Sequence, residues 1–363
     1  MTLAAEPNLL PWEPLYSTTR ADIQGVPQPE VTVYGVAYVW AENLAAQNNS
    51  GLALLRVGDT NLPLWSRSLL KPFQLMVLYP TLKQAYPTLT RTHFALLMAS
   101  HQGDPEQLKL LKEVMAVGQL SEAELHCPAC ACIRGRNPQN ESTLHHPCSG
   151  KHLAHLLYLK ARHLPLENYL HRDQEPYHLL RELLCYLLYV DELPESVDGC
   201  GMPNLGLSAV ELAQLYHALV LPVSRDMIRQ CPDELTEILT HWDDIAALMQ
   251  EYPELIGGTG RLDSRLMLGE GCHQPLPPLI AKEGAEGLLC LGTGPTERHA
   301  GGLGILIKLS GGYNAGQLEV MAHYIFQALG LSASEPGEAK PQAATPMTET
   351  VFHFAVQGVQ AEV

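Results

Sequence analysis

Strand-like segments lie near the two ends of this chain, and helical segments fill its middle. Dense apolar and β-branched residues at 31–40 and 52–57 predict two antiparallel strands, with turn residues between them at 48–51. Short apolar runs between glycines at 287–292 and 302–309 predict strands near the other end. This order predicts one α+β domain whose antiparallel sheet joins both ends of the chain and is flanked by helices. Helical spacing of apolar residues predicts helices over 69–78, 93–98, 106–117, 151–163, 176–189, 208–219 and 317–329.

Composition changes at the two ends suggest where that domain begins and ends. Residues 1–28 are rich in proline and polar residues, which predicts an N-terminal arm. Residues 29–332 are then expected to form one domain, and residues 333–363 a tail. The tail begins with linker-like composition, and 351–356 predicts an edge strand within it.

The charge and the absence of apolar stretches argue against several partners. The formal net charge is -16 at pH 7, and no Lys/Arg run offsets it, so neither nucleic acid nor an anionic membrane is an expected partner. No apolar run of the length of a membrane span occurs, and the first residues do not resemble a secretory signal. Nine cysteines in such a chain are expected to be mostly reduced, which favours the cytoplasm.

Ser68 and Lys71 stand in S-x-x-K spacing at a predicted helix start. Three residues make nearly one helical turn, so the two side chains share a face. A lysine whose pKa is depressed can accept the serine proton, and the helix start places Ser68 at the positive end of the helix dipole. Pro72 disfavours helical geometry at Lys71, although proline is tolerated in a first turn. Because the spacing is common by chance, the alternative is that this pair carries no chemistry.

Two later motifs fit the same chemistry. Ser100 follows an apolar helix within Ser-His-Gln, and Lys282 begins Lys-Glu-Gly just before the strand at 287–292. Serine acyl-enzymes of the β-lactamase and penicillin-binding type carry S-x-x-K, S-D-N and K-T-G in this chain order. Here the order is kept while the second and third motifs are altered. The alternatives are a helix cap for Ser100 and a solvated strand end for Lys282.

Two glycine-containing turns each hold a thiol, Cys148 in one and Cys200 in the other. Two thiolates with one or two nitrogens suit tetrahedral zinc. Spacing alone favours a histidine as the third ligand, either His152 or His145. The alternative is that both thiols are buried core residues near tight turns.

Two further motifs give weaker signals. The cysteines at 127, 130 and 132 have metal-like spacing, but no second C-x-x-C completes a structural site. The glycine-rich segment 257–261 lacks the lysine of a phosphate loop. It predicts instead a loop that faces the substrate, with Arg261 placed to meet a carboxylate.

Six motifs taken together resemble the rhizobial-type, thermolabile L-asparaginases, also called asparaginase II. The resemblance covers about residues 29–330, and it is distinct from the threonine-dependent bacterial and plant-type asparaginases. The cysteine cluster at 127–132 and the tail after Leu331 are not features of this family. The six motifs are Arg67-Ser68-x-x-Lys71-Pro72, Ser100-His101, Cys148-Ser149-Gly150-Lys151-His152, Asp198-Gly199-Cys200-Gly201, Gly258-Thr259-Gly260-Arg261 and Lys282-Glu283-Gly284.

The resemblance implies a fold like serine β-lactamases and glutaminases, usually in a homodimer, and hydrolysis of L-asparagine to L-aspartate and ammonia. It implies two serine-lysine tandems, Ser68 with Lys71 and Ser100 with Lys282. Ser68 is then the expected nucleophile and Lys71 its proton acceptor. The second tandem supplies a nearby cation that lowers the pKa of Lys71.

The resemblance also implies a metal site, normally zinc, at Cys148, Lys151 and Cys200, with a water completing the shell. In this reading Lys151 takes the position that spacing alone gave to a histidine. A lysine ligand must be neutral, so the metal has to lower its pKa strongly. Asp198 is expected to orient Lys151 or the bound water.

The substrate contacts implied by the same motifs are Arg67, His101, Thr259 and Arg261. Two other functions remain open from the sequence. One is a different serine amidohydrolase on the same fold, such as a glutaminase or a penicillin-recognising enzyme. The other is a non-catalytic, zinc-containing protein that binds an amino acid.

Overall fold

The computed structural model describes residues 11–21, 26–42, 51–131, 141–272, 277–332 and 348–354. Most of the predicted turn at 48–51 and most of the predicted linker in the tail lie outside these ranges, as does Cys132.

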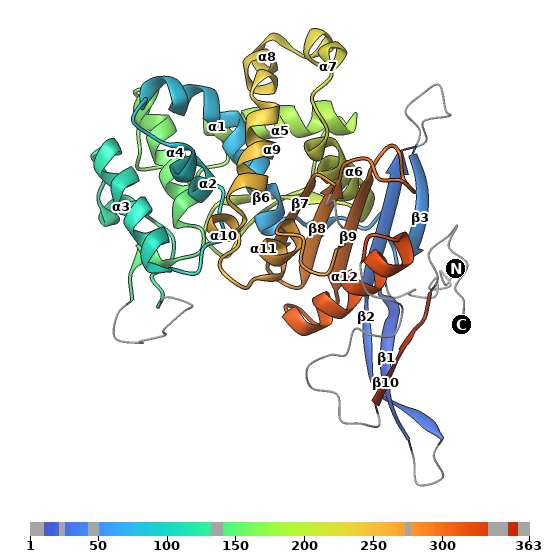
Figure 1. Ribbon diagram of the computed structural model, residues 1–363. Coiled ribbons are helices and arrows are strands. Elements are labelled where there is room, and N and C mark those ends of the chain that lie inside the picture. Colours follow the sequence, from blue (N-terminus) through green and yellow to red (C-terminus); the bar gives the residue numbers. More distant parts are fainter. Residues whose placement is uncertain are drawn as a thin grey trace, which may run out of the picture.

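An antiparallel seven-stranded sheet joins segments from both ends of the chain, as the sequence predicts (Figure 1). Its order is β10-β1-β2-β9-β8-β7, and β3 pairs with β2 off this path. The central register places Tyr38 of β2 opposite Leu306 of β9. The strands are β1 (Glu13–Ala21), β2 (Pro27–Glu42), β3 (Gly51–Val57), β7 (Leu279–Gly284), β8 (Leu288–Thr293), β9 (Leu303–Leu309) and β10 (Thr348–Phe352).

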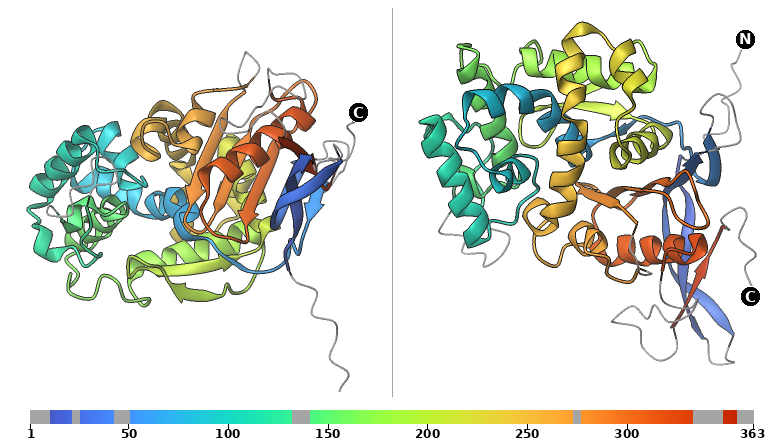
Figure 2. Two further views of the ribbon diagram at one scale, coloured as in Figure 1. Left: turned by 90° about the horizontal axis from the view of Figure 1, so that it is seen from below. Right: turned by 45° about the horizontal axis from the view of Figure 1, so that its top comes forward.

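Helices pack on this sheet and extend away from it as a separate layer (Figures 1 and 2). The predicted helices are all confirmed, with ends within two residues of those expected, except that α1 extends seven residues beyond the predicted end at 78. Five short helices between 225 and 267 were not predicted. The helices are η1 (Arg67–Leu70), α1 (Lys71–Ala85), α2 (Arg91–Leu97), α3 (Pro105–Gly118), η2 (Glu122–Glu124), η3 (Thr143–His145), α4 (Ser149–Ala161), α5 (Glu175–Leu188), α6 (Ala209–Val220), α7 (Arg225–Gln230), α8 (Asp233–Thr240), α9 (Trp242–Glu251), α10 (Pro253–Ile256), α11 (Leu262–Met267) and α12 (Ala315–Leu329).

Paired glycines allow α6 to lie very close to the sheet. Gly292 of β8 faces Gly304 of β9 in the strand register. A Cβ atom at Gly292 would lie 2.1 Å from the carbonyl oxygen of Tyr216, and one at Gly304 would lie 2.0 Å from that of Ala213. Side chains at either position would therefore push α6 away from the sheet. On the other face of the sheet, α12 packs on β9.

The helix that carries Lys71 runs through the middle of the helical layer. It packs against α4, α5, α8 and α9, and its Phe73, Met76 and Leu78 are all 0% exposed. A helix that is buried on all sides has little freedom to move. The start of α1 is thus a rigid support for the residues placed there.

The expected N-terminal arm is in part a strand, which corrects the prediction for residues 1–28. Residues 13–21 form β1, which pairs with β2. Its Leu15, Tyr16, Ser17 and Thr19 are at most 7% exposed. The strand was not predicted because its Ser and Thr residues were counted as polar arm composition.

The predicted edge strand of the tail exists, but it begins earlier than expected. β10 spans 348–352 and pairs with the outer edge of β1, with Phe352 opposite Tyr16. The Phe352 ring stacks on Tyr324 of α12 at a centroid distance of 3.6 Å. This aromatic contact fixes the position of β10 against the sheet. The alternating pattern in the sequence did not by itself give that position.

A smaller sheet carries one wall of the site described below. It has the order β4-β6-β5, formed by β4 (Leu64–Trp65), β6 (Pro203–Leu207) and β5 (Glu195–Val197). In the described part of the chain, none of the helices has the length and apolarity that crossing a bilayer requires.

Candidate active site

Ser68 lies in a tight helical turn that leads directly into the buried helix α1. The turn is η1, and α1 begins at Lys71, so Pro72 occupies the first turn of the helix. At this position its missing N–H costs no hydrogen bond, which explains why the proline is tolerated. Arg67, just before Ser68, has a φ of 51°. A left-handed conformation at a non-glycine residue stores strain and often marks a functional turn.

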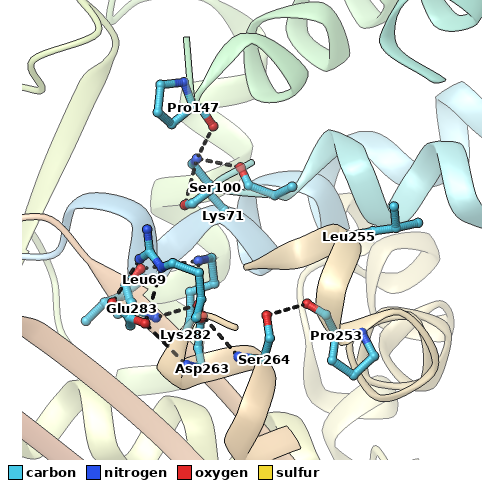
Figure 3. Close-up of polar contacts among 12 residues, drawn as sticks. Leu69, Lys71, Ser100, Pro147, Pro253, Leu255, Asp263, Ser264, Lys282 and Glu283 are labelled. Atoms are coloured by element: carbon cyan, nitrogen blue, oxygen red, sulfur yellow. Dashed lines mark hydrogen bonds and ion pairs between the residues drawn. The ribbon is translucent and has the colours of Figure 1, made fainter. Parts of the chain in front are cut away.

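Lys71 is buried and makes three polar contacts through its amine (Figure 3). Its Nζ donates to the carbonyl oxygens of Ala99 at 2.5 Å and Pro147 at 3.1 Å, and lies 3.1 Å from Ser100 Oγ. A neutral amine has two N–H groups and one lone pair, which matches two carbonyls and one hydroxyl. The arrangement therefore suits a lysine that accepts a proton from Ser100.

Burial also sets the protonation of this lysine. It lowers the pKa of Lys71 to about 8, opposed by the Cys148 thiolate and assisted by the ammonium groups of Lys151 and Lys282. A base with a pKa near neutrality is the kind that proton transfer at an active site requires.

The cavity beside this lysine contains both serines. Its volume is about 590 Å³, and its wall includes Ser68, Ser100 and Gln102. Ser68 is partly exposed, whereas Ser100 is 7% exposed. Within the part of the chain that the structure describes, no hydrogen bond joins Ser68 Oγ to Lys71 Nζ. The sequence paired Lys71 with Ser68, but the direct contact of Lys71 is with Ser100.

Lys282 is fully buried on β7 and forms an ion pair that the sequence did not suggest. Its Nζ lies 3.0 Å from Asp263 Oδ2 and 3.2 Å from the carbonyl oxygen of Glu283. Burial would raise the pKa of Asp263, but the cations Lys282 and Arg261 hold it below its ordinary value. In the described residues Lys282 makes no hydrogen bond with Ser100, its partner in the expected tandem.

The strand that carries Lys282 nevertheless packs against the Ser68 turn. A Cβ atom at Gly284 of β7 would lie 3.5 Å from a side-chain carbon of Leu69 in η1. Asp263 escaped notice in the sequence because it lies in the short helix α11, which shows no clear periodicity. The one feature of the sequence that could have pointed to Asp263 is its position two residues after Arg261.

Arg261 lines the cavity, and two residues hold its guanidinium. It forms an ion pair with the buried Glu283 at 2.9 Å and lies over the Tyr313 ring at 5.6 Å from the centroid. Glu283 and Tyr313 also line the cavity, and neither was singled out as a site residue from the sequence. Arg67 and Asp198 form a second ion pair in the same wall, with Nε to Oδ1 at 2.5 Å.

His101 and Thr259 do not line this cavity. His101 is 0% exposed, and its Nε2 lies 2.8 Å from Ser149 Oγ while its Nδ1 accepts from the Gly103 N–H at 3.2 Å. Burial and the nearby Lys71 lower the pKa of His101 to about 3, so the ring is neutral. Thr259 lines a different cavity of about 330 Å³, together with Asp104.

Three of the residues expected around a metal come together in the cavity wall. Ligand atoms of Cys148, Asp198 and Cys200 all lie within 4.8 Å of one another. Lys151 Nζ lies 3.9 Å from Asp198 Oδ2. A hydrogen bond from the Cys200 thiol holds the pKa of Cys148 well below its usual range despite burial, with help from Lys71 and Lys151.

The histidines that spacing favoured are not in this group. His152 Nδ1 lies 2.6 Å from the hydroxyl of Tyr169, and neither His152 nor His145 belongs to the Cys148 cluster among the described residues. Cys127 donates to the carbonyl oxygen of Thr143 at 3.4 Å, and Cys130 forms a backbone bridge with Ser142. Neither cysteine is part of the cluster.

A depressed-pKa lysine that contacts a serine hydroxyl at a cavity is the arrangement of serine-lysine hydrolases. The L-asparaginase II family model matches residues 38–355, and the chain belongs to this family. Membership places it among the amidohydrolases, and no curated protein matches the sequence.

Some solved structures are also similar to this chain. One is a probable glutaminase from Bacillus subtilis complexed with 6-diazo-5-oxo-L-norleucine, with 16% identity, 83% of this chain and 85% of that chain covered, and a TM-score of 0.39. Another is a Bacillus glutaminase, with 14% identity, 82% and 92% of the two chains covered, and a TM-score of 0.38. Because these TM-scores are low, we draw no conclusion about this chain from the similarity.

Proposed function

We propose that this chain hydrolyses L-asparagine to L-aspartate and ammonia through an acyl-enzyme formed on a serine. One observation carries the proposal: the Lys71 amine, with its lowered pKa, contacts Ser100 in a cavity that Ser68 also lines. Membership in the L-asparaginase II family supports asparagine as the substrate.

Ser68 is the proposed nucleophile because it is the more exposed of the two serines and begins the run into α1. Its Oγ attacks the side-chain amide carbon, and its proton passes through Ser100 to Lys71. The backbone N–H of Ser68, at the positive end of the helix dipole, is a candidate donor to the resulting oxyanion. The C–N bond then breaks, and the proton on Lys71 returns to the leaving ammonia.

Water completes the reaction by attacking the ester carbon on Ser68. Ser100 and Lys71 accept the proton of this water in the same way as before. The ester bond breaks, the proton held by Lys71 passes back through Ser100 to Ser68 Oγ, and aspartate leaves.

The charges of the cavity suit the head group of a free amino acid. Its wall contains the cations Arg67 and Arg261 and the anions Asp198, Glu283 and Glu286. An α-amino acid carries a negative α-carboxylate and a positive α-ammonium group. The wall cations can pair with the carboxylate, and the wall anions can pair with the ammonium group. Arg261 is the proposed partner of the α-carboxylate. His101 and Thr259 lie outside the cavity and are given no contact with substrate.

We also propose a zinc ion held by Cys148, Lys151 and Cys200. Two thiols with an amine and a carboxylate nearby form a donor set that fits this metal. Zinc bound there supplies positive charge and rigidity to the cavity wall. Asp198 orients Lys151 and at the same time contacts Arg67, so the metal loop and the Ser68 turn share one carboxylate.

Three broader proposals come with this function. The fold is proposed to be of the serine β-lactamase/penicillin-binding type, which the antiparallel sheet with flanking helices supports. The chain is proposed to act in the cytoplasm, because the cysteines of the described residues are free thiols. A homodimer without nucleic-acid or membrane partners is proposed from the family resemblance and the net charge of -16.

Substrate comparison tests the proposal. Ammonia release from L-asparagine and L-glutamine, and the absorbance change on ring opening of a chromogenic β-lactam, should be measured with zinc-replete protein. The expected result is turnover of asparagine with kcat/KM at least about 100-fold above that for the others. Preference for glutamine or the β-lactam would instead identify another serine amidohydrolase. Calorimetric binding of asparagine without ammonia release would identify a non-catalytic binding protein.

A further inference from the structure

A fully buried ion pair lies beside the cavity wall, and the proposed reaction alone does not account for it. The side chains of Lys282 and Asp263 are both 0% exposed, and their Nζ and Oδ2 atoms are 3.0 Å apart. Removing an ammonium from water is costly unless a counter-charge lies close by. Asp263 supplies that counter-charge.

Asp263 is itself fixed by the backbone. Its Oδ2 accepts from the Glu283 N–H at 3.0 Å, and its Oδ1 accepts from the Ser264 N–H at 3.1 Å. In return, the backbone N–H of Asp263 donates to Glu283 Oε1 at 3.3 Å. These reciprocal bonds join the start of α11 to β7 (Figure 3). A carboxylate bound by several fixed donors has one position, and the ammonium that pairs with it is fixed as well.

The surroundings leave the carboxylate no alternative position. A Cβ atom at Gly257 would lie 2.3 Å from Asp263 Oδ1, so a glycine is needed where the chain passes it. Arg261 pairs with Glu283, and Lys282 pairs with Asp263. The two acidic and two basic side chains therefore balance in charge. Lys282 and Asp263 are both fully buried, and the lower effective dielectric of the interior strengthens their attraction.

We propose that Asp263 is the positioning residue of Lys282, holding its ammonium beside the Ser68 turn and Lys71. The inference rests on the proposed function, because a fixed cation matters there only if amide hydrolysis takes place beside it. Among the described residues, Asp263 is not part of the cavity wall. It therefore acts on the reaction through Lys282 and leaves substrate binding to other residues.

Steady-state kinetics of Asp263→Asn test this role. Asparagine is isosteric with aspartate but carries no charge, so kcat is expected to fall by about 100-fold while KM changes by less than about threefold. Asp263→Glu returns the carboxylate, and its kcat is expected to be about tenfold higher than that of Asp263→Asn. Ser264→Ala is the matched control. It removes a buried hydrogen bond to the Pro253 carbonyl at 2.9 Å without touching the ion pair, and its kcat should stay near the parent value.

A second measurement needs no turnover. Lysine acylation followed by peptide mass spectrometry reports how accessible and how reactive the Lys282 amine is. In the parent and in Ser264→Ala this amine should react slowly, and in Asp263→Asn it should react about tenfold faster or more. Asp263→Ala, which also removes the carboxylate, provides the same comparison if Asp263→Asn does not fold.

The two measurements separate failure of the inference from failure of the proposed function. A parent protein that hydrolyses no amide, with Lys282 acylation still dependent on Asp263, would refute the proposed function alone. Equal acylation of Lys282 in Asp263→Asn and Ser264→Ala would refute the positioning role. So would a parent-like kcat in Asp263→Asn when Lys282→Met is inactive.

Discussion

Lys71 Nζ lies 3.1 Å from Ser100 Oγ, a hydroxyl 29 residues farther along the chain. The S-x-x-K spacing places Lys71 beside Ser68, but the contact to Ser100 depends on how α1 packs against the segment that follows α2. If Ser100 relays the proton of Ser68, both serines are needed in different ways. The predictions below separate these roles.

Ser68→Ala is expected to abolish ammonia release and leave the fold intact. Losing the nucleophile should lower kcat/KM by about 1,000-fold or more, equivalent to ~4 kcal/mol of transition-state stabilisation. Initial rates of ammonia release, with thermal unfolding as the measure of folding, check this. Residual activity within about tenfold of the parent would remove Ser68 from the role of nucleophile. Ser310→Ala, an exposed serine in a loop, is the control and should be fully active.

Ser100→Ala separates relay from nucleophile. The relay model predicts slow turnover, about 100-fold below the parent, with the acyl group still forming on Ser68. Mass spectrometry of protein quenched during turnover locates the acyl group. An acyl group found on Ser100 in the parent protein would reverse the two assignments.

The rate should rise with pH through the titration of Lys71. The amine must be neutral to accept a proton, and its pKa is lowered to about 8. Activity is therefore lost as the pH falls below this value and reaches a plateau above it. Measuring kcat/KM between about pH 6 and about pH 10 checks the sign and position of this limb. A rate that falls through the same range would show that the protonated form of the group is the active one.

Lys282→Met should remove nearly all activity, although this residue is far from Ser68 in sequence. Its ammonium lowers the pKa of Lys71, so its loss should shift the acid limb of any residual activity to higher pH. Lys83→Met is the control, because Lys83 pairs with Asp244 and does not line the cavity. Normal activity and an unchanged pH profile in Lys282→Met would refute a role for the second cation.

The local parts of this site could be predicted from the sequence, and its long-range pairings could not. Ser68 and Lys71 lie at the start of the same buried helix, as their spacing predicts, but in the described residues no hydrogen bond joins their side chains. Lys282 was expected to pair with Ser100, but its ionic partner is Asp263, which lies in a short helix. Such a pairing depends on the register between α11 and β7, and no local spacing contains that information.

The same distinction holds for the fold and the substrate contacts. The long helices were predicted, whereas β1 was missed because its polar residues resemble a linker. His101 adjoins Ser100 in its motif, yet the ring points into the core and bonds to Ser149. Adjacency in a motif therefore predicts that residues share a segment, and packing decides which of them reach the cavity.

Removing zinc should lower both stability and substrate affinity. The protein is expected to hold about one zinc per chain, as a single closed site does. Cys148 and Lys151 lie three residues apart at the start of α4, whereas Cys200 comes from a separate loop, so the ion would join two distant segments. A ligand at 100 times its Kd stabilises the folded state by about 2.7 kcal/mol, and chelation removes this contribution. Scanning calorimetry and the KM for asparagine, each with and without chelator, measure the two effects.

Paired cysteine variants locate that ion. Cys200→Ser should reproduce the effects of chelation, because it removes a thiolate from the cluster with Cys148 and Asp198. Cys231→Ser should not, because its thiol contacts Ile228 and Thr236 instead. Ser68 and Lys71 are unchanged in both variants, so some activity at high asparagine concentration should survive in Cys200→Ser. Elemental analysis provides the direct measurement. A metal-free protein with full activity, or zinc retained after both Cys148 and Cys200 are replaced, would show that these thiols are core residues.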